Sequence, residues 1–196
     1  MTISLDDIAQ LFGRHGAQAY SGEPVSQLQH ALQTAWLAEQ AGEDDELVTA
    51  CLLHDLGHLL NDQGETPTLR GVDDTHQYFA LPFLRGLFPD RVLDAIKLHV
   101  DAKRHLCRMH PRYWEALSTD SKRSLVLQGG IYEKTECLEF IAQPGAAEAI
   151  KLRQWDDQAK QPGLTTPDLQ HFLARAARCR VPNLPVTQLN IFSGFS

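Results

Sequence analysis

The chain has 196 residues, 43% of them apolar and 22% charged, and a net charge of −7. This length and composition predict one globular domain, residues 1–196, with a sizeable core. The negative net charge, without a block of Lys and Arg, argues against nucleic acid as a partner, because general nucleic-acid binding needs a basic surface. No apolar run approaches the length of a membrane span, so we also expect no membrane partner.

The cysteines lie far apart without paired spacing, which predicts reduced thiols: Cys51, Cys107, Cys137 and Cys179. The N-terminus carries Asp6 and Asp7 and lacks the charge pattern of a signal peptide. Together these features predict a cytoplasmic protein.

Apolar residues return at intervals of three and four along nearly the whole chain, which predicts an all-α fold, a helical bundle. A helix is expected over 26–42, with Ser26 as its N-cap and a glycine at its end. A second helix is expected from about 44 to 60. The polar segment 61–71 then reads as a surface loop that could act as a lid.

Asp73 or Asp74 is expected to open a helix that carries His76, and Pro89 a helix that carries His99. Further helices are predicted over 112–117, 119–128, 133–141, 145–160 and 168–178. The segment 180–196 contains two prolines and is expected to dock as an extended tail. A second subunit could provide the docking surface, so a homo-oligomer is one assembly that the sequence allows.

The most informative feature is His54-Asp55, two adjacent ionisable residues inside an apolar stretch. Burying them is costly without compensation, and a metal ion would provide it. On a helix, His54 and His58 share a face while Asp55 is rotated away, so the pair can aim two ligands into one cavity. For this pair alone, a histidine satisfied by protein groups is an equal alternative.

The number of ligand-type residues on separate predicted helices favours metal binding. Six residues form this set: His30, His54, Asp55, His76, His99 and Asp156. They would complete two sites with open positions, and Asp55 could bridge them. Imidazole with carboxylate suits iron, manganese or zinc, whereas the shortage of nearby thiolates argues against an iron–sulfur cluster.

This spacing resembles the HD-domain superfamily of metal-dependent phosphohydrolases, from His30 to Asp156. The resemblance implies Asp156 as the final ligand, because Arg-x-x-Asp is the family's form and Arg153 precedes it by three. Asp157 is the rival residue. The default activity of the superfamily is hydrolysis, in which metals polarise a phosphate and activate water.

Four segments resemble a narrower group, the mixed-valence diiron oxygenases that cleave hydroxylated aminoethylphosphonates and are related to myo-inositol oxygenase. They are Tyr20-Ser21-Gly22-Glu23 with Gln27-Leu28-Gln29-His30, His99-Val100-Asp101-Ala102-Lys103-Arg104, Gln128-Gly129-Gly130, and Arg153-Gln154-Trp155-Asp156. The resemblance implies two iron ions in the Fe(II)/Fe(III) state, with a hydroxyphosphonate and O2 as substrates. Oxygenation of C1 would break the C–P bond and yield a carboxylate and inorganic phosphate.

The same resemblance implies which residues hold each iron. His30, His54, Asp55 and Asp156 would bind one, and Asp55, His76 and His99 the other.

A small anion pocket is predicted beside the ligands. Lys103 lies four residues after His99, and Arg153 three before Asp156, so both cations can point at what the metals hold. His58, Ser121 and Gln128 would add donors suited to the three oxygens of a phosphonate. Taken singly, each cation would be expected to be a solvated surface charge.

Tyr20 and Glu23 take roles from the resemblance alone. It implies that Tyr20 occupies the dioxygen position until substrate arrives, and that Glu23 helps to sense the substrate's cationic group. From local sequence, Tyr20 could equally pack before the helix and Glu23 could be a solvated loop residue.

The sequence does not decide which amino group the substrate carries, a primary amine or a trimethylammonio group. The segment 68–75 lacks the glycine-rich run associated with the primary-amine enzymes. Asp73, Asp74, Tyr78 and Phe79 could surround a quaternary ammonium by charge and cation–π attraction. A trimethylammonio substrate, giving glycine betaine, therefore stands beside the primary amine, which would give glycine. Helix capping and core packing are the alternative roles of these four residues.

Three functions remain on sequence grounds: an oxygenase that cleaves a hydroxyphosphonate, a metal-dependent HD phosphohydrolase acting on a nucleotide or phosphate monoester, and a noncatalytic metal-binding signalling domain.

Overall fold

The computed structural model describes residues 3–20, 22–61, 67–73 and 75–182, and this part of the chain is helical, as predicted. In chain order the helices are α1 (Leu5–His15), α2 (Gln27–Gln40), α3 (Asp45–Leu53), α4 (Leu56–Leu60), the 3₁₀ helix η1 (Pro67–Arg70), α5 (His76–Phe79), α6 (Leu81–Leu84), α7 (Asp90–Met109), α8 (Pro111–Ala116), α9 (Thr119–Leu127), α10 (Lys134–Ile141), α11 (Ala146–Gln158) and α12 (Leu169–Arg178). The all-α fold class is confirmed.

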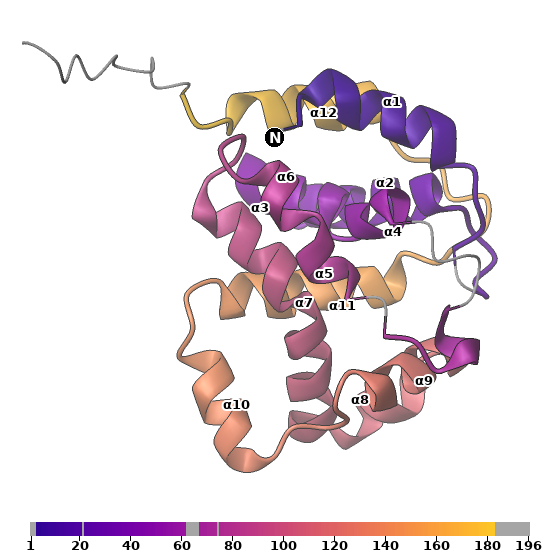
Figure 1. Cartoon of the computed structure of the whole chain (residues 1–196), viewed down its shortest axis with the longest axis vertical. Helices are drawn as coiled ribbons and strands as arrows, with labels where there is room; N and C mark the ends of the chain where they lie inside the picture. The colour runs from indigo at the N-terminus through magenta and orange to yellow at the C-terminus, as the bar shows by residue number, and fades with distance from the viewer. Residues whose placement is uncertain (1–2, 21, 62–66, 74, 183–196) are drawn as a thin grey trace, which may run out of the picture.

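The long helix α7 is the central support of the bundle. It packs against α11 and α3, and α2 in turn packs on α3 and α11. Figure 1 shows α1 and α12 together at one end of the molecule and α8, α9 and α10 at the other. Side chains from both the N-terminal and C-terminal helices meet in one main core, which includes Phe12, Leu53, Ile96, Leu152 and Phe172. The functional residues lie on helices held by this core.

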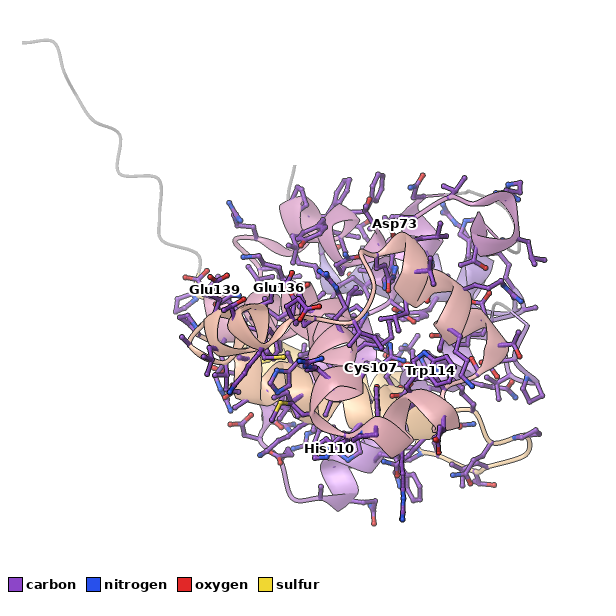
Figure 2. The ribbon with its side chains drawn as sticks, turned by 90° about the horizontal axis from the view of Figure 1, so that it is seen from below. Asp73, Cys107, His110, Trp114, Glu136 and Glu139 are labelled. Atoms are coloured by element: carbon purple, nitrogen blue, oxygen red, sulfur yellow. The ribbon has the colours of Figure 1, made fainter. Side chains whose placement is uncertain are left out.

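A smaller apolar cluster supports the far end of α7. Cys107 packs there with Leu117 and Leu125, while His110 begins the turn into α8. Figure 2 labels Cys107, His110 and Trp114 along this turn. The turn brings α9, which carries part of the predicted anion pocket, back toward α7.

Capping explains why α2 begins where the sequence predicted. The Ser26 hydroxyl accepts the backbone N–H of Gln29, and the Gln29 side chain accepts the backbone N–H of Ser26, over 3.2 and 2.8 Å. This reciprocal capping box satisfies two donors that the first turn of a helix leaves free. It fixes the start of the helix that carries His30.

The predicted single helix over 44–60 is wrong, because the chain breaks at His54-Asp55. Helix α3 ends at Leu53 and α4 starts at Leu56, and Asp55 has φ −101° and ψ 12°, outside the helical range. The buried polar pair turns its side chains into the interior at this break. His54 and His58 therefore do not share the face of one continuous helix.

The predicted start of the His76 helix is also wrong. Helix α5 has no side-chain cap, and the residue before it, Thr75, is in the left-handed region with φ 46°. Asp73 accepts the backbone N–H of Thr75 over 3.3 Å instead of capping a helix. Asp74 lies outside the described residues.

Other differences concern the ends of the chain. Helix α1 was not predicted, although Ser4 and Asp7 form a capping box at its start. The 3₁₀ helix η1 lies inside the segment 61–71 that was expected to be a loop, and α6 was not predicted. Helices α2 and α7 to α12 agree with the predicted ranges to within a few residues. Residues 183–196 of the expected tail lie outside the described residues. No helix among the described residues combines the length and apolar character needed to cross a membrane.

Gly57 allows α4 to lie directly against α5, and this contact yields a test. A Cβ at Gly57 would lie 2.1 Å from the backbone oxygen of His76. We expect Gly57→Ala to push the His76 backbone away and to lower the free energy of unfolding by about 1–3 kcal/mol, the usual range for overpacking. Thermal unfolding measures this loss.

Gly13→Ala is the matched control, since a Cβ at Gly13 would meet nothing within 4 Å. It should leave the melting temperature equal or slightly higher, because alanine favours a helix interior. Equal melting temperatures for the two variants would contradict the close approach at Gly57.

Candidate metal centre

Backbone carbonyls fix the orientation of three buried imidazoles. Their Nδ1 atoms donate to carbonyl oxygens over 2.9, 2.9 and 2.7 Å: His30 to Ala159, His54 to Cys51 and His99 to Ile96. A carbonyl oxygen only accepts, so each Nδ1 carries the proton and a neutral ring presents a lone pair at Nε2. This arrangement is typical of metal-binding histidines.

The Nε2 atoms face one another in two pairs. His30 and His54 approach to 3.2 Å, and His76 and His99 to 3.1 Å. Two bare lone pairs at such a distance would repel, so each pair needs one shared proton or a metal ion between its nitrogens. The raised pKa of His30 agrees with a shared proton in the metal-free protein, and a metal ion bound by both nitrogens would take the place of that proton. The residues present therefore fit a metal ion in each half of the site.

Asp55 lies between the two pairs and faces both. Its Oδ2 is 3.5 Å from Nε2 of His30 and 3.3 Å from that of His54. Its Oδ1 is 3.3 Å from Nε2 of His76 and 3.7 Å from that of His99. The buried Oδ2 has no hydrogen-bond partner among the described residues. A carboxylate so placed can bridge two metal ions.

Asp156, rather than Asp157, faces the histidines. Its Oδ1 lies 3.3 Å from Nε2 of His30 and, like Oδ2 of Asp55, is buried without a hydrogen-bond partner among the described residues. Its Oδ2 pairs with Arg153 over 2.8 Å. Asp157 points elsewhere, and its carboxylate pairs with Arg153 and the hydroxyl of Tyr113.

The pKa shifts describe a site that attracts positive charge. Burial alone would raise the pKa values of Asp55 and Asp156, but neighbouring positive groups, with His54 first for Asp55 and Arg153 first for Asp156, hold both well below the usual range. Burial would lower the pKa of His30, but Asp156 and Asp55 raise it to about 9. Burial, then His76 and His54, hold the pKa of His99 well below its ordinary value.

Most predicted site residues line one cavity. Tyr20, Glu23, Asp55, His58, His76, His99, Lys103, Ser121, Gln128, Arg153 and Asp156 form part of its wall. His30 and His54 are fully buried. Residues that sequence reasoning missed also line the cavity: Thr68, Val100, Asp120, Ser124 and Lys160. Most of them lie next to, or three or four residues from, a predicted site residue such as His99, Ser121 or Asp156, so helical spacing could have marked them, whereas Thr68 has no such neighbour.

Cationic and polar groups gather on the wall beside the ligands. Lys103 is 2% exposed and donates to the Ser124 hydroxyl over 2.8 Å, and Arg153 is 5% exposed. Burial, then the charge of Arg153, lowers the pKa of Lys103 to about 7. The Oε1 atom of Gln128 is buried without a hydrogen-bond partner among the described residues. Lys103 and Arg153 can donate to the oxygens of a small anion, whereas Oε1 of Gln128 can only accept, for example from a hydroxyl group.

The glycine pair after Gln128 explains its position. Gly129 and Gly130 have φ 98° and 74°, values that favour glycine. Arg104 holds the turn by donating to the carbonyls of Gly130 and Gly129 over 2.8 and 3.0 Å. The turn ends α9 and leaves the Gln128 side chain at the cavity.

Two rings cover the imidazoles. Tyr20 stacks on His30 with ring centroids 3.9 Å apart and 15° between the planes. Burial, then the charges of Asp55 and Asp156, raise the pKa of Tyr20 well above its ordinary value. The hydroxyl of Tyr20 therefore stays protonated near neutral pH. In the other half of the site, His58 stacks on His76 with ring centroids 4.2 Å apart.

The expected cage for a quaternary ammonium does not form at this cavity. Tyr78 and Phe79 are 45% and 38% exposed, and neither they nor Asp73 contribute to the described cavity wall. Tyr78 and Phe79 are the last two residues of the short helix α5 and are partly exposed at the surface, and Asp73 precedes that helix.

The fold and the site define a helical protein with a buried metal centre of histidines and aspartates. The HD domain model matches residues 28–135, more than half of the chain. The chain is 37% identical to the 1-hydroxy-2-(trimethylamino)ethyl-phosphonate dioxygenase (glycine-betaine-forming) of Leisingera caerulea, with 87% of each chain covered. It is 41% identical to the hydroxymethylphosphonate dioxygenase of Gimesia maris, with 87% of this chain and 85% of that protein covered. The chain belongs to the HD-domain family.

The choice between Asp156 and Asp157 can be tested by metal content. Asp156→Asn should remove a charged ligand and lower the bound metal by about one ion per chain, because an amide is a weaker ligand than a carboxylate. Asp157→Asn is the matched control, one residue along the same helix, and should keep the wild-type metal content. Elemental analysis after dialysis measures both. The reverse result would make Asp157 the ligand.

The burial of Lys103 can be tested by the pH dependence of the protein's stability. Its pKa of about 7 lies below the ordinary 10.5, so between these values the unfolded chain binds a proton that the folded chain lacks. Stability of the metal-free wild type should therefore rise with pH from about 7 toward 10, by up to about 1.4 kcal/mol per pH unit, from this residue. Lys103→Met should lack this gain and be more stable than wild type below pH 7.

The control for this test is Lys97→Met, which removes a less buried lysine from the same helix. Denaturant unfolding from pH 6 to 9.5 compares the three proteins. Parallel stability curves for wild type and Lys103→Met would show that Lys103 is charged throughout, against the burial argument.

Proposed function

We propose that the protein is a non-haem diiron oxygenase that uses O2 to cleave the C–P bond of a hydroxyphosphonate. The observation that carries this proposal is a cavity whose wall contains His76, His99, the shared Asp55 and the buried cations Lys103 and Arg153, with the pair His30 and His54 buried directly behind Asp55. A site for two metal ions beside an anion pocket suits a phosphonate whose C1 hydroxyl lies next to the anion. The two relatives named as phosphonate dioxygenases support the same activity.

The reaction balances without a further reductant. A 1-hydroxyphosphonate and O2 yield a carboxylate, inorganic phosphate and a proton, and both oxygen atoms of O2 enter the products. The C–P bond and the C1–H bond break, and C1 is oxidised by four electrons. When bound, the metals supply Lewis acidity and the redox capacity for oxygen activation.

The proposed ligands divide into two sets. His30, His54, Asp55 and Asp156 form one, and Asp55, His76 and His99 the other, with Asp55 common to both. The proposed ions are iron in the mixed Fe(II)/Fe(III) state. Nitrogen and oxygen donors with no cysteine in either set are suited to non-haem iron.

The protein's own residues would hold the phosphonate. Lys103 and Arg153 provide buried charge, and Ser121, Gln128 and His58 provide further polar groups on the same wall. A phosphonate oxygen that accepts from the Lys103 ammonium keeps that group protonated, so binding would draw a proton to Lys103. We assign to these phosphonate-binding residues the role of orienting C1 of the substrate toward the metals.

Tyr20 would restrict access to the half of the site that contains His30. Its ring lies flat on that imidazole, and its hydroxyl is close enough to Asp55 to be affected by the carboxylate. Substrate binding would have to displace the hydroxyl before dioxygen could react. This protects the protein from oxygen activation without substrate.

Phosphate release under air and under argon tests the function. We expect the iron-loaded protein to release one phosphate per O2 consumed from a hydroxyphosphonate in air, and none under argon. Hydrolysis of a phosphate ester, the alternative activity, needs no O2. Hydroxymethylphosphonate and 1-hydroxy-2-aminoethylphosphonate should both be supplied, so that the result does not depend on the substituent at C1.

The control pair is His54→Gln, which removes a fully buried proposed ligand, and His110→Gln, which removes an exposed histidine. The first should lose more than a hundredfold in rate and the second should match wild type. Equal phosphate release with and without oxygen would exclude the oxygenase.

A further inference from the structure

The cavity contains a carboxylate that already has a cationic partner. Oε1 of Glu23 lies 3.1 Å from Nζ of Lys160, and the two side chains are only 13% and 14% exposed. Both line the cavity that contains Asp55 and Lys103. The pair spans 137 residues of sequence, from the loop before α2 to the residue pair that follows α11. It therefore depends on the tertiary fold and not on a local motif.

Backbone hydrogen bonds hold both partners in place. Glu23 donates its N–H to the carbonyl of Tyr20 over 2.7 Å. Lys160 follows Ala159, whose carbonyl orients His30, and precedes Gln161, whose N–H and carbonyl both bond to the side chain of Gln33. The ion pair is thus fixed relative to the metal centre. A substrate would meet Lys160 already bound to Glu23.

The other carboxylates of the described cavity wall are also engaged. Asp120 accepts the Thr68 hydroxyl over 2.5 Å and the Arg123 guanidinium over 3.0 Å. Asp55 and Asp156 face the histidines. Among the described residues that line the cavity, no carboxylate remains for an ammonium group of a substrate.

We propose that Lys160 is a specificity-determining residue that selects hydroxyphosphonates without a cationic group at C2, such as hydroxymethylphosphonate. It takes the position on Glu23 that a substrate ammonium would need. An aminated substrate must either break a largely buried ion pair or place its charge beside Lys160, and both weaken binding. This inference rests on the proposed function, and for hydroxymethylphosphonate the carboxylate product is formate.

The first test compares three substrates on the wild-type enzyme: hydroxymethylphosphonate, 1-hydroxy-2-aminoethylphosphonate and its trimethylammonio analogue. We expect kcat/KM, measured by phosphate release in air, to be at least tenfold higher for the first than for either cationic substrate. The discrimination should appear mainly in KM, because the ion pair acts on binding of the substituent and not on the reacting C1.

The second test removes the lysine. Lys160→Met leaves Glu23 without a cation and should raise kcat/KM for the primary-amine substrate at least tenfold, with unchanged metal content. The double variant Lys160→Met with Glu23→Gln should lose this gain, because the anion is gone. Lys151→Met is the matched control, since Lys151 forms a surface pair with Glu43 over 2.7 Å and should not change the preference.

A wild-type preference for either cationic substrate, or an unchanged preference in Lys160→Met, would overturn the assignment of Lys160. If Lys160→Met does not fold, the wild-type comparison decides. If no hydroxyphosphonate yields phosphate in air, the proposed function fails. Calorimetric competition between hydroxymethylphosphonate and the amine for the metal-loaded site then still decides the specificity.

Discussion

The structure depends on a buried cluster of histidines and aspartates that needs positive charge, from protons or from metal ions, between its members. In each half of the site two imidazole nitrogens face each other at about hydrogen-bond distance, and carboxylate oxygens of Asp55 and Asp156 point at the same places without a donor. Burial of these groups carries a desolvation cost, which His54 and Arg153 partly offset by holding the carboxylate pKa values low. Bound metal ions would offset it further, so metal binding and folding stability are expected to be coupled.

The fold supplies this arrangement from distant segments. The break between α3 and α4 turns His54 and Asp55 inward, the glycine that follows lets α5 bring His76 close, and α7 adds His99 and Lys103 on one face. Helix α11 contributes most: it carries Arg153 and Asp156, and the carbonyl just after it orients His30. The ligands and the anion pocket are thus built on the same helices, which explains how a metal centre and a phosphonate site can be positioned together.

Helical periodicity predicted the all-α fold class, whereas the number of ligand-type residues and the resemblance to HD-domain proteins picked out the ligands and the cations that the fold brings to one place. Three features of the structure could not be predicted from the sequence. The break at His54-Asp55 follows from tertiary burial, which overrides a continuous helical pattern. The left-handed residue before His76 left no capping signal. The Glu23–Lys160 pair joins segments too far apart for spacing to reveal, yet it changes the expected role of Glu23 from sensing a cationic substrate to holding a cation of the protein.

The most direct test of the central claim is a crystal structure of the iron-loaded protein with anomalous data collected at the iron edge. Two peaks should appear, one between His30 and His54 and one between His76 and His99, with one oxygen of Asp55 toward each. A single peak, or two peaks with Asp55 turned away from either, would contradict the account.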